Sequence, residues 1–251
     1  MLENRNSPTT YVNEERYAGV DVPAFATRDA EPDWVEVASD GRYSWHDHRA
    51  HWMQSVAPFG KSVGDRIVED RIGLIVDGVE VDVEVISTWQ PEPSPLPAIG
   101  GAAAALTLAA VAVFRWRATR AWMLVLAPLA TLAVVAGVAQ YTSLPSETGP
   151  RLVWIALPII AVVATIAAVV SESRTATLAA HGAALIAAVQ LVVWGLVKRD
   201  GLTAAIVPTS APGWFDRLAV AGALVGGVAL VALALVALFG PQPRPGEPVS
   251  A

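Results

Sequence analysis

The sequence predicts a membrane-embedded bundle of five transmembrane helices, preceded by a small β-sandwich-like domain. Three observations predict this fold class. The chain of 251 residues is 54% hydrophobic and only 16% charged, with a mean hydropathy of +0.47. Its second half contains five apolar runs that each approach the ~20 residues needed to cross a hydrocarbon core. Its first half instead carries β-branched runs separated by Asp-Gly pairs, which are typical of hairpins.

Charge divides the chain into the same two parts. Residues 1–95 carry 8 Lys/Arg against 18 Asp/Glu, whereas residues 96–251 carry 9 against 5. We predict an extracytoplasmic β-rich domain at residues 1–90 and a stiff proline-rich linker at 91–97. The five-helix transmembrane domain follows at 98–240, and a disordered cytoplasmic tail at 241–251.

The β-rich domain is expected to begin with a long polar loop. Two short strands then flank Asp40-Gly41, and a hairpin over residues 66–89 turns at Asp77-Gly78. The alternating valines from Val79 to Val85 predict one buried face, opposite a wet acidic face. Four strands are fewer than the roughly seven of a sandwich, and no signal peptide is visible. We therefore expect a truncated sandwich in a chain that begins inside a longer exported protein.

The predicted transmembrane spans end at charges or turn-forming residues. They are Leu96–Phe114, Trp122–Gln140, Leu152–Val170, Ala176–Val197 and Leu218–Phe239. The loop after the first span, RWRATR, holds three arginines, and the twenty residues before that span hold no Lys or Arg. Because cationic loops stay in the cytoplasm, this contrast places the amino terminus outside and the carboxy terminus inside. Counted over all loops and the tail the contrast weakens, with five Lys/Arg on the inside against four on the outside.

The octet WHDHRAHW, residues 45–52, holds three of the four histidines. In an extended strand His46 and His48 share a face, an arrangement that suits a Cu or Zn ion. His51 joins them only if the chain turns after Arg49. The alternative interpretation is structural, and both stay open. In it Trp45 and Trp52 anchor the strand in the core, while Asp47, Arg49 and the histidines form hydrogen bonds across the sheet.

The stretches ENRNSPTTYVN, WHDHRAHWM and VPTSAPGWFDRLAVA carry a resemblance that covers most of the chain. In these stretches the chain resembles a group of uncharacterised actinobacterial multi-pass membrane proteins. The resemblance implies a signal peptide, an extracytoplasmic β-domain carrying the WHDHRxHW motif, and carboxy-terminal helices. It implies no activity.

These patterns predict a non-catalytic cell-envelope protein in the plasma membrane. Its β-domain is expected to bind a partner outside the membrane, so the lipid bilayer and an envelope protein are the expected partners. The alternative is an extracytoplasmic protein that binds or handles copper or zinc through His46, His48 and His51. The acidic half disfavours nucleic acid, and no catalytic or nucleotide-binding motif is visible, so we expect neither catalytic nor cofactor-binding residues. The lack of cysteine excludes thiolate ligands.

Overall fold

A computed structural model describes residues 1–14, 20–40, 43–54, 56–114, 119–144, 148, 150–173 and 177–240. The chain divides into an N-terminal unit, Met1–Pro91, and a helical unit, Glu92–Ala251. The predicted tail at 241–251 lies outside the described residues, as does Gly41 in the predicted Asp-Gly turn.

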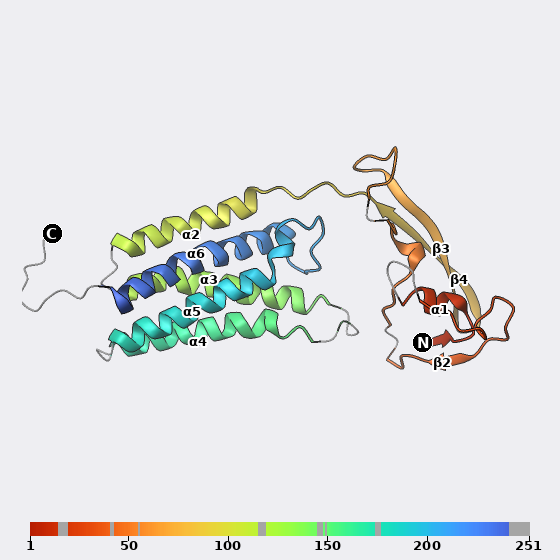
Figure 1. Cartoon of the computed structure of the whole chain (residues 1–251), viewed down its shortest axis with the longest axis horizontal. Coiled ribbons are helices and arrows are strands. Elements are labelled where there is room, and N and C mark those ends of the chain that lie inside the picture. The colour runs from red at the N-terminus through yellow and green to blue at the C-terminus, as the bar shows by residue number, and fades with distance from the viewer. Residues whose placement is uncertain are drawn as a thin grey trace, which may run out of the picture. The chain divides into compact units, whose positions relative to one another are not determined.

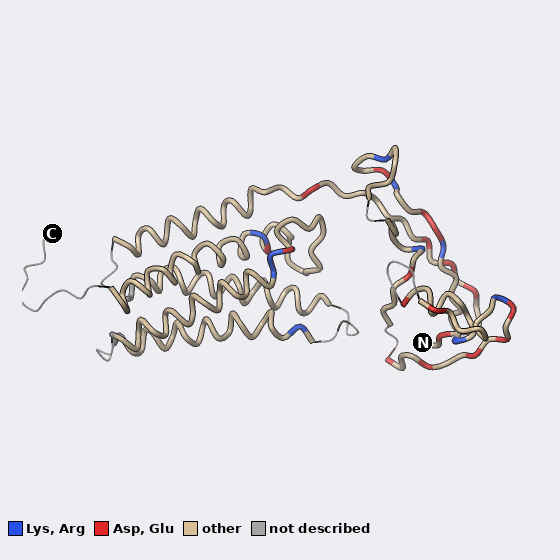
Figure 2. Tube along the Cα trace, in the orientation of Figure 1, with Lys and Arg blue, Asp and Glu red and all other residues tan. Residues whose placement is uncertain are grey.

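Among its described residues the helical unit contains five helices long and apolar enough to span a membrane, which confirms the predicted multi-pass bundle. They are α2 (Leu96–Phe114), α3 (Thr119–Tyr141), α4 (Val153–Ser173), α5 (Thr177–Val197) and α6 (Gly213–Phe239) (Figure 1). The charged residues described in this unit lie at or beyond the helix ends, as Figure 2 shows. Helix α6 contacts α2, α3 and α5, and α4 packs on α3 and α5.

Small residues dominate the interior of the bundle. Alanines fill most of the core, around the fully buried side chains of Trp122, Trp194 and Leu126. Many larger apolar side chains on the same helices are exposed, as expected where lipid surrounds them. His181 of α5 stacks on Trp122 of α3 with ring centroids 5.0 Å apart, so this histidine contributes to helix packing.

Close helix contact depends on particular glycines. A Cβ atom on Gly101 of α2 would lie 2.2 Å from the carbonyl oxygen of Leu218 in α6. A Cβ atom on Gly226 of α6 would lie 2.4 Å from Cδ1 of Leu129 in α3. No ordinary contact is that short. At Gly101 the clash is with backbone, so only glycine permits this approach of α2 and α6, whereas at Gly226 the Leu129 side chain would have to move. Gly226 belongs to the small-residue spacing that begins at Gly222, so this spacing serves helix packing.

The N-terminal unit contains two separate two-stranded antiparallel sheets. In one, β1 (Leu2–Asn4) pairs with β2 (Trp34–Glu36). In the other, β3 (Arg66–Val76) pairs with β4 (Val79–Thr88), which confirms the predicted hairpin. Its turn residues Asp77 and Gly78 have φ of 52° and 79°, the left-handed pair that a type I′ turn requires. A short helix, α1 (Pro8–Val12), lies between β1 and β2 in sequence (Figure 1).

Four predictions for this unit were wrong. No closed sandwich forms in the part of the chain that the structure describes. The amino-terminal segment predicted as a loop contains β1 and α1. The helix starts at Ser7-Pro8. Next to β1, the side-chain oxygen of Asn4 accepts hydrogen bonds from the backbone N–H groups of Asn6 (3.0 Å) and Asp33 (2.9 Å). No second strand follows Asp40 in the described part of residues 37–53, because this segment bonds to residues near Asn13 instead.

The predicted buried valine face is the fourth correction. On β4 the side chains of Val79, Val81 and Val83 are exposed, and the opposite acidic side chains are exposed as predicted. The facing residues of β3 show how far this face is covered. Ile72, opposite Val83, is buried, whereas Val76, opposite Val79 beside the turn, is exposed. Only one end of the apolar face is therefore covered. Among its described residues, this unit buries only Ala26, Asp47 and Ile72.

Candidate functional site

The histidine octet is not a strand, contrary to the extended conformation considered for it. Residues 43–47 have no regular structure, and His48–Ala50 form one turn of 3-10 helix. Asp47 caps this turn, because its Oδ1 accepts a hydrogen bond from the backbone N–H of Arg49 at 3.0 Å. The turn supplies the change of direction that His51 needs to reach the other two histidines.

The three imidazole rings therefore gather in one cluster, His46–His48–His51. The ring centroids of His46 and His51 lie 4.6 Å apart with the planes 25° from parallel. His48 stands edge-on to both, with its centroid 5.0 Å from His46 and 6.3 Å from His51. The structure thus brings together all three residues that the sequence offered as metal ligands.

Backbone carbonyls fix which ring nitrogen of each stacked histidine carries a hydrogen. His46 Nδ1 lies 3.0 Å from the Asn13 carbonyl oxygen, and His51 Nδ1 lies 3.0 Å from the Trp52 carbonyl oxygen. A carbonyl only accepts, so each Nδ1 must donate. In a neutral ring the remaining nitrogen, Nε2, then presents a lone pair.

The two Nε2 atoms contact each other directly. Two lone pairs facing one another repel, so the arrangement favours a shared hydrogen between the two nitrogens. A metal ion between them would require the nitrogens to move apart. A histidine that ligates a metal through one nitrogen commonly donates the other N–H to a backbone carbonyl, as His46 and His51 both do. The pair thus has the tautomer and the orientation of metal ligands.

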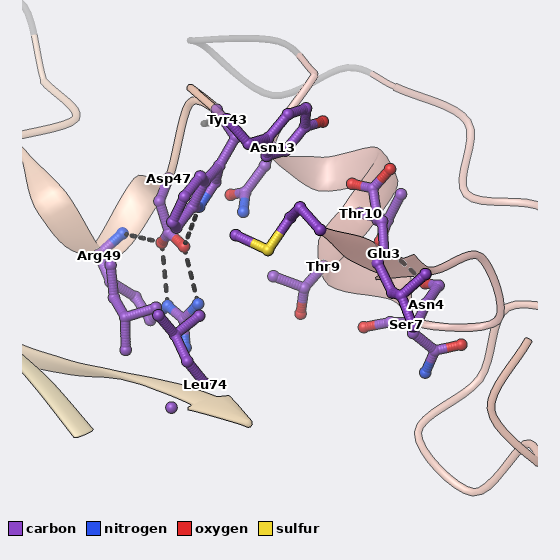
Figure 3. A pocket seen from close by; sticks show the side chains of 15 residues that line it. Glu3, Asn4, Ser7, Thr9, Thr10, Asn13, Tyr43, Asp47, Arg49 and Leu74 are labelled. Atoms are coloured by element: carbon purple, nitrogen blue, oxygen red, sulfur yellow. Dashed lines mark hydrogen bonds and ion pairs between the residues drawn. The ribbon is translucent and has the colours of Figure 1, made fainter. Parts of the chain in front are cut away.

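The neighbouring carboxylate is engaged elsewhere. Arg49 Nε donates to Asp47 Oδ1 at 2.9 Å and Arg49 Nη2 to Oδ2 at 2.7 Å, while Trp45 Nε1 donates to Oδ2 at 3.3 Å (Figure 3). The hydrogen bonds from Arg49, opposed by burial, lower the pKa of Asp47 to about 2. Within the described ranges, no three His, Cys, Asp or Glu side chains are placed to hold one ion.

Asp47 and Arg49 line a cavity of about 300 Å³ together with Trp45. Figure 3 shows the Asp47–Arg49 ion pair on one side of this cavity and Glu3, Asn4 and Ser7 on the other. The Thr10 hydroxyl donates to the Asn4 carbonyl at 2.9 Å. None of the three clustered histidines lines this cavity, so His51 lies with His46 and His48 and not with Trp45, Asp47 and Arg49 as an extended strand would have placed it.

The structural interpretation of the two tryptophans was wrong. Trp45 is 41% exposed and stacks on Tyr43 with centroids 5.9 Å apart, and Trp52 is half-buried with Nε1 donating to the Val56 carbonyl at 2.8 Å. Neither anchors a strand in a core. Asp47 and Arg49 do not form hydrogen bonds across a sheet. They pair with each other, because the capped turn brings these two side chains together.

Sequence reasoning missed a buried charged cluster, Lys198–Asp216–Arg217. Lys198 Nζ donates to Asp216 Oδ1, with side chains 2% and 1% exposed, and lies 4.9 Å from the Trp194 ring centroid. Burial lowers the pKa of Lys198, and Asp216 opposes this shift. Arg217 Nη2 donates to the Ala204 carbonyl at 2.6 Å. A signal was present in the sequence. Lys198 follows the carboxy-terminal end of one span and Asp216 lies in the first turn of the next, so opposite charges stand at the two helix ends that the same loop joins.

Comparisons with known proteins add no relative: no family model matches the chain, and no similar curated protein or solved structure is found.

Proposed function

We propose that this multi-pass membrane protein is non-catalytic and binds a copper or zinc ion through its N-terminal unit. One observation supports it most directly: the Nε2 atoms of His46 and His51 face each other while both Nδ1 atoms are held by carbonyls. Imidazole nitrogen suits both metals. The ligands come from residues five apart, positioned by a capped turn, so the geometry is set locally.

The proposed location of the site is the outer face of the plasma membrane. The argument is the cluster of arginines at 115, 117 and 120, between the first two spans, against none in the twenty residues before Leu96. The carboxy terminus is then cytoplasmic, since five spans place the two ends on opposite sides. A membrane-anchored site there would capture or buffer metal that reaches the cell envelope.

Metal titration of the full-length protein in lipid nanodiscs tests this function. We expect uptake of one Cu or Zn ion per chain by isothermal calorimetry, lost in both His46→Ala and His51→Ala. His181→Ala removes the one histidine outside the cluster and serves as the matched control. Stoichiometric binding that survives both single variants, or its absence from the native chain, contradicts the proposal.

Binding of an envelope protein is the second candidate, and an exposed groove favours it. The groove, about 740 Å³ in volume, is bounded by Leu2 and Trp34 on one side and by Leu74, Val76 and Val81 of the hairpin on the other. An exposed apolar surface of this kind is typical of protein contacts. A photo-activated cross-linker at Ile75 in living cells should capture one discrete partner, and Val76→Asp should abolish the adduct. Equal labelling in the variant contradicts this candidate.

A further inference from the structure

We infer that the ion held by His46 and His51 is Cu(I), bound between two imidazole nitrogens in near-linear geometry. This inference rests on the proposed metal-binding function and specifies its ligand. It concerns binding alone, and the oxidation state of the ion does not change.

The number of donors favours a metal that accepts two. Zn(II) in proteins is almost always four-coordinate, with three or four ligands supplied by the chain. The structure places two ring nitrogens in opposition, and among the described residues no third His, Cys, Asp or Glu completes a common site. Cu(I), a d¹⁰ monovalent ion, is stable with two nitrogen ligands on opposite sides.

The direction of the lone pairs agrees with a linear ion. Each Nε2 points at the other, so an ion between them would be held from opposite sides. Metal–nitrogen bonds of about 2 Å require the nitrogens to separate to about 4 Å. A side-chain rotation of the half-buried His51 would supply this separation, and it must be small enough to keep the hydrogen bond from His51 Nδ1 to the carbonyl of the adjacent Trp52.

Local charge favours a monovalent ion. The nearest carboxylate, Asp47, is already neutralised by two hydrogen bonds from Arg49 and is 4% exposed. A divalent ion between two neutral imidazoles would keep its full double charge with no carboxylate ligand, whereas Cu(I) leaves a single charge. His48, edge-on to both rings, is placed beside the pair and not between its nitrogens.

Anaerobic Cu(I) competition tests the inference on the full-length protein in nanodiscs, with bicinchoninate as the competing chelator. We expect one Cu(I) per chain and a loss of about 100-fold or more in affinity in His46→Ala and His51→Ala, since half of the ligands are removed. His48→Ala should stay within about threefold of the native chain. X-ray absorption should show two nitrogen neighbours, and excess Zn(II) should not displace the ion.

The outcomes separate this inference from the function on which it rests. If neither Cu(I) nor Zn(II) binds, the proposed function itself fails. If Zn(II) binds stoichiometrically and His48→Ala abolishes binding, the site is a three-histidine zinc site and only the Cu(I) inference is overturned. Hydrogen exchange over residues 43–54 in each variant shows whether the turn is intact. A ligand variant that loses Cu(I) with unchanged exchange supports the inference, and one that keeps Cu(I) overturns it.

Discussion

Asp47 is the residue that organises the histidine octet. It caps the turn at His48–Ala50, receives both hydrogen bonds from the Arg49 guanidinium, and is one of three buried residues described in its unit. Every hydrogen bond it accepts favours the charged form, which is why its pKa falls. Because the turn orients His51, the geometry of the histidine pair depends on this carboxylate.

Replacing Asp47 by Asn should destabilise the octet segment by about 2 kcal/mol near neutral pH. The pKa of Asp47 is about 2 in the folded chain, below the ordinary value of 3.8, so its contribution is present above about pH 4 and is lost as pH falls toward 2. Hydrogen exchange over residues 43–54 in the full-length protein should accelerate about 30-fold.

The matched control for this substitution is Asp82→Asn. Asp82 pairs with Arg71 at 3.9 Å, and both side chains are more than 60% exposed, at 64% and 72%. An exposed pair of this kind contributes little, so exchange should be unchanged. Equal effects of the two substitutions would contradict the role assigned to Asp47.

At the scale of elements, helices α2 and α6 pack backbone against backbone. Gly101 faces the Leu218 carbonyl, while the adjacent Gly100 has no atom within 4 Å of the position that a Cβ would take. In lipid the association of helices depends on such close packing, because burial of apolar surface supplies little driving force.

Gly101→Ala should therefore separate α2 from α6 and destabilise the bundle by about 1–3 kcal/mol, the usual cost of overpacking. Gly100→Ala on the same helix should be neutral or slightly stabilising, because it adds only helix propensity. Thermal unfolding of both variants in one detergent compares them. Similar melting temperatures for the two variants would show that this glycine contact does not limit helix packing.

Helices α5 and α6 are joined by the buried pair of Lys198 and Asp216. Lys198→Met should cost about 3–5 kcal/mol, because it leaves the Asp216 carboxylate buried without its cation. The double variant Lys198→Met/Asp216→Asn should recover most of that loss, since it removes both charges of the pair. Thermal unfolding in detergent measures both, and a double variant that is less stable than the single one argues against the pair as the cause.

On the scale of the whole molecule, the helices were predictable and much of the N-terminal unit was not. Long apolar runs determine a span almost alone, so the predicted Val197 and Phe239 are the observed ends of α5 and α6. The hairpin was equally local, because Asp77-Gly78 determines its turn. The cluster of three histidines required a contact with Asn13, 33 residues before His46, and sequence periodicity carries no information about such a contact.

Membrane orientation can be measured directly because the chain contains no cysteine. With the amino terminus outside, Ser62→Cys in the N-terminal unit should react with an impermeant maleimide on intact cells. Thr119→Cys, at the start of α3, should react only after the cells are opened. The reverse pattern would place the histidine cluster in the cytoplasm and remove the basis for a site that meets metal in the envelope.

The small core of the N-terminal unit has a calorimetric consequence. With Ala26, Asp47 and Ile72 as its buried residues among those described, unfolding exposes little new apolar surface. Its heat-capacity increment must therefore fall below the common ~12–15 cal/mol/K per residue, and its stability curve is correspondingly flat. The free energy of unfolding of this unit then changes little per degree. The stabilisation added by a bound ion would therefore raise its melting temperature by more degrees than it would for a unit with a steep curve.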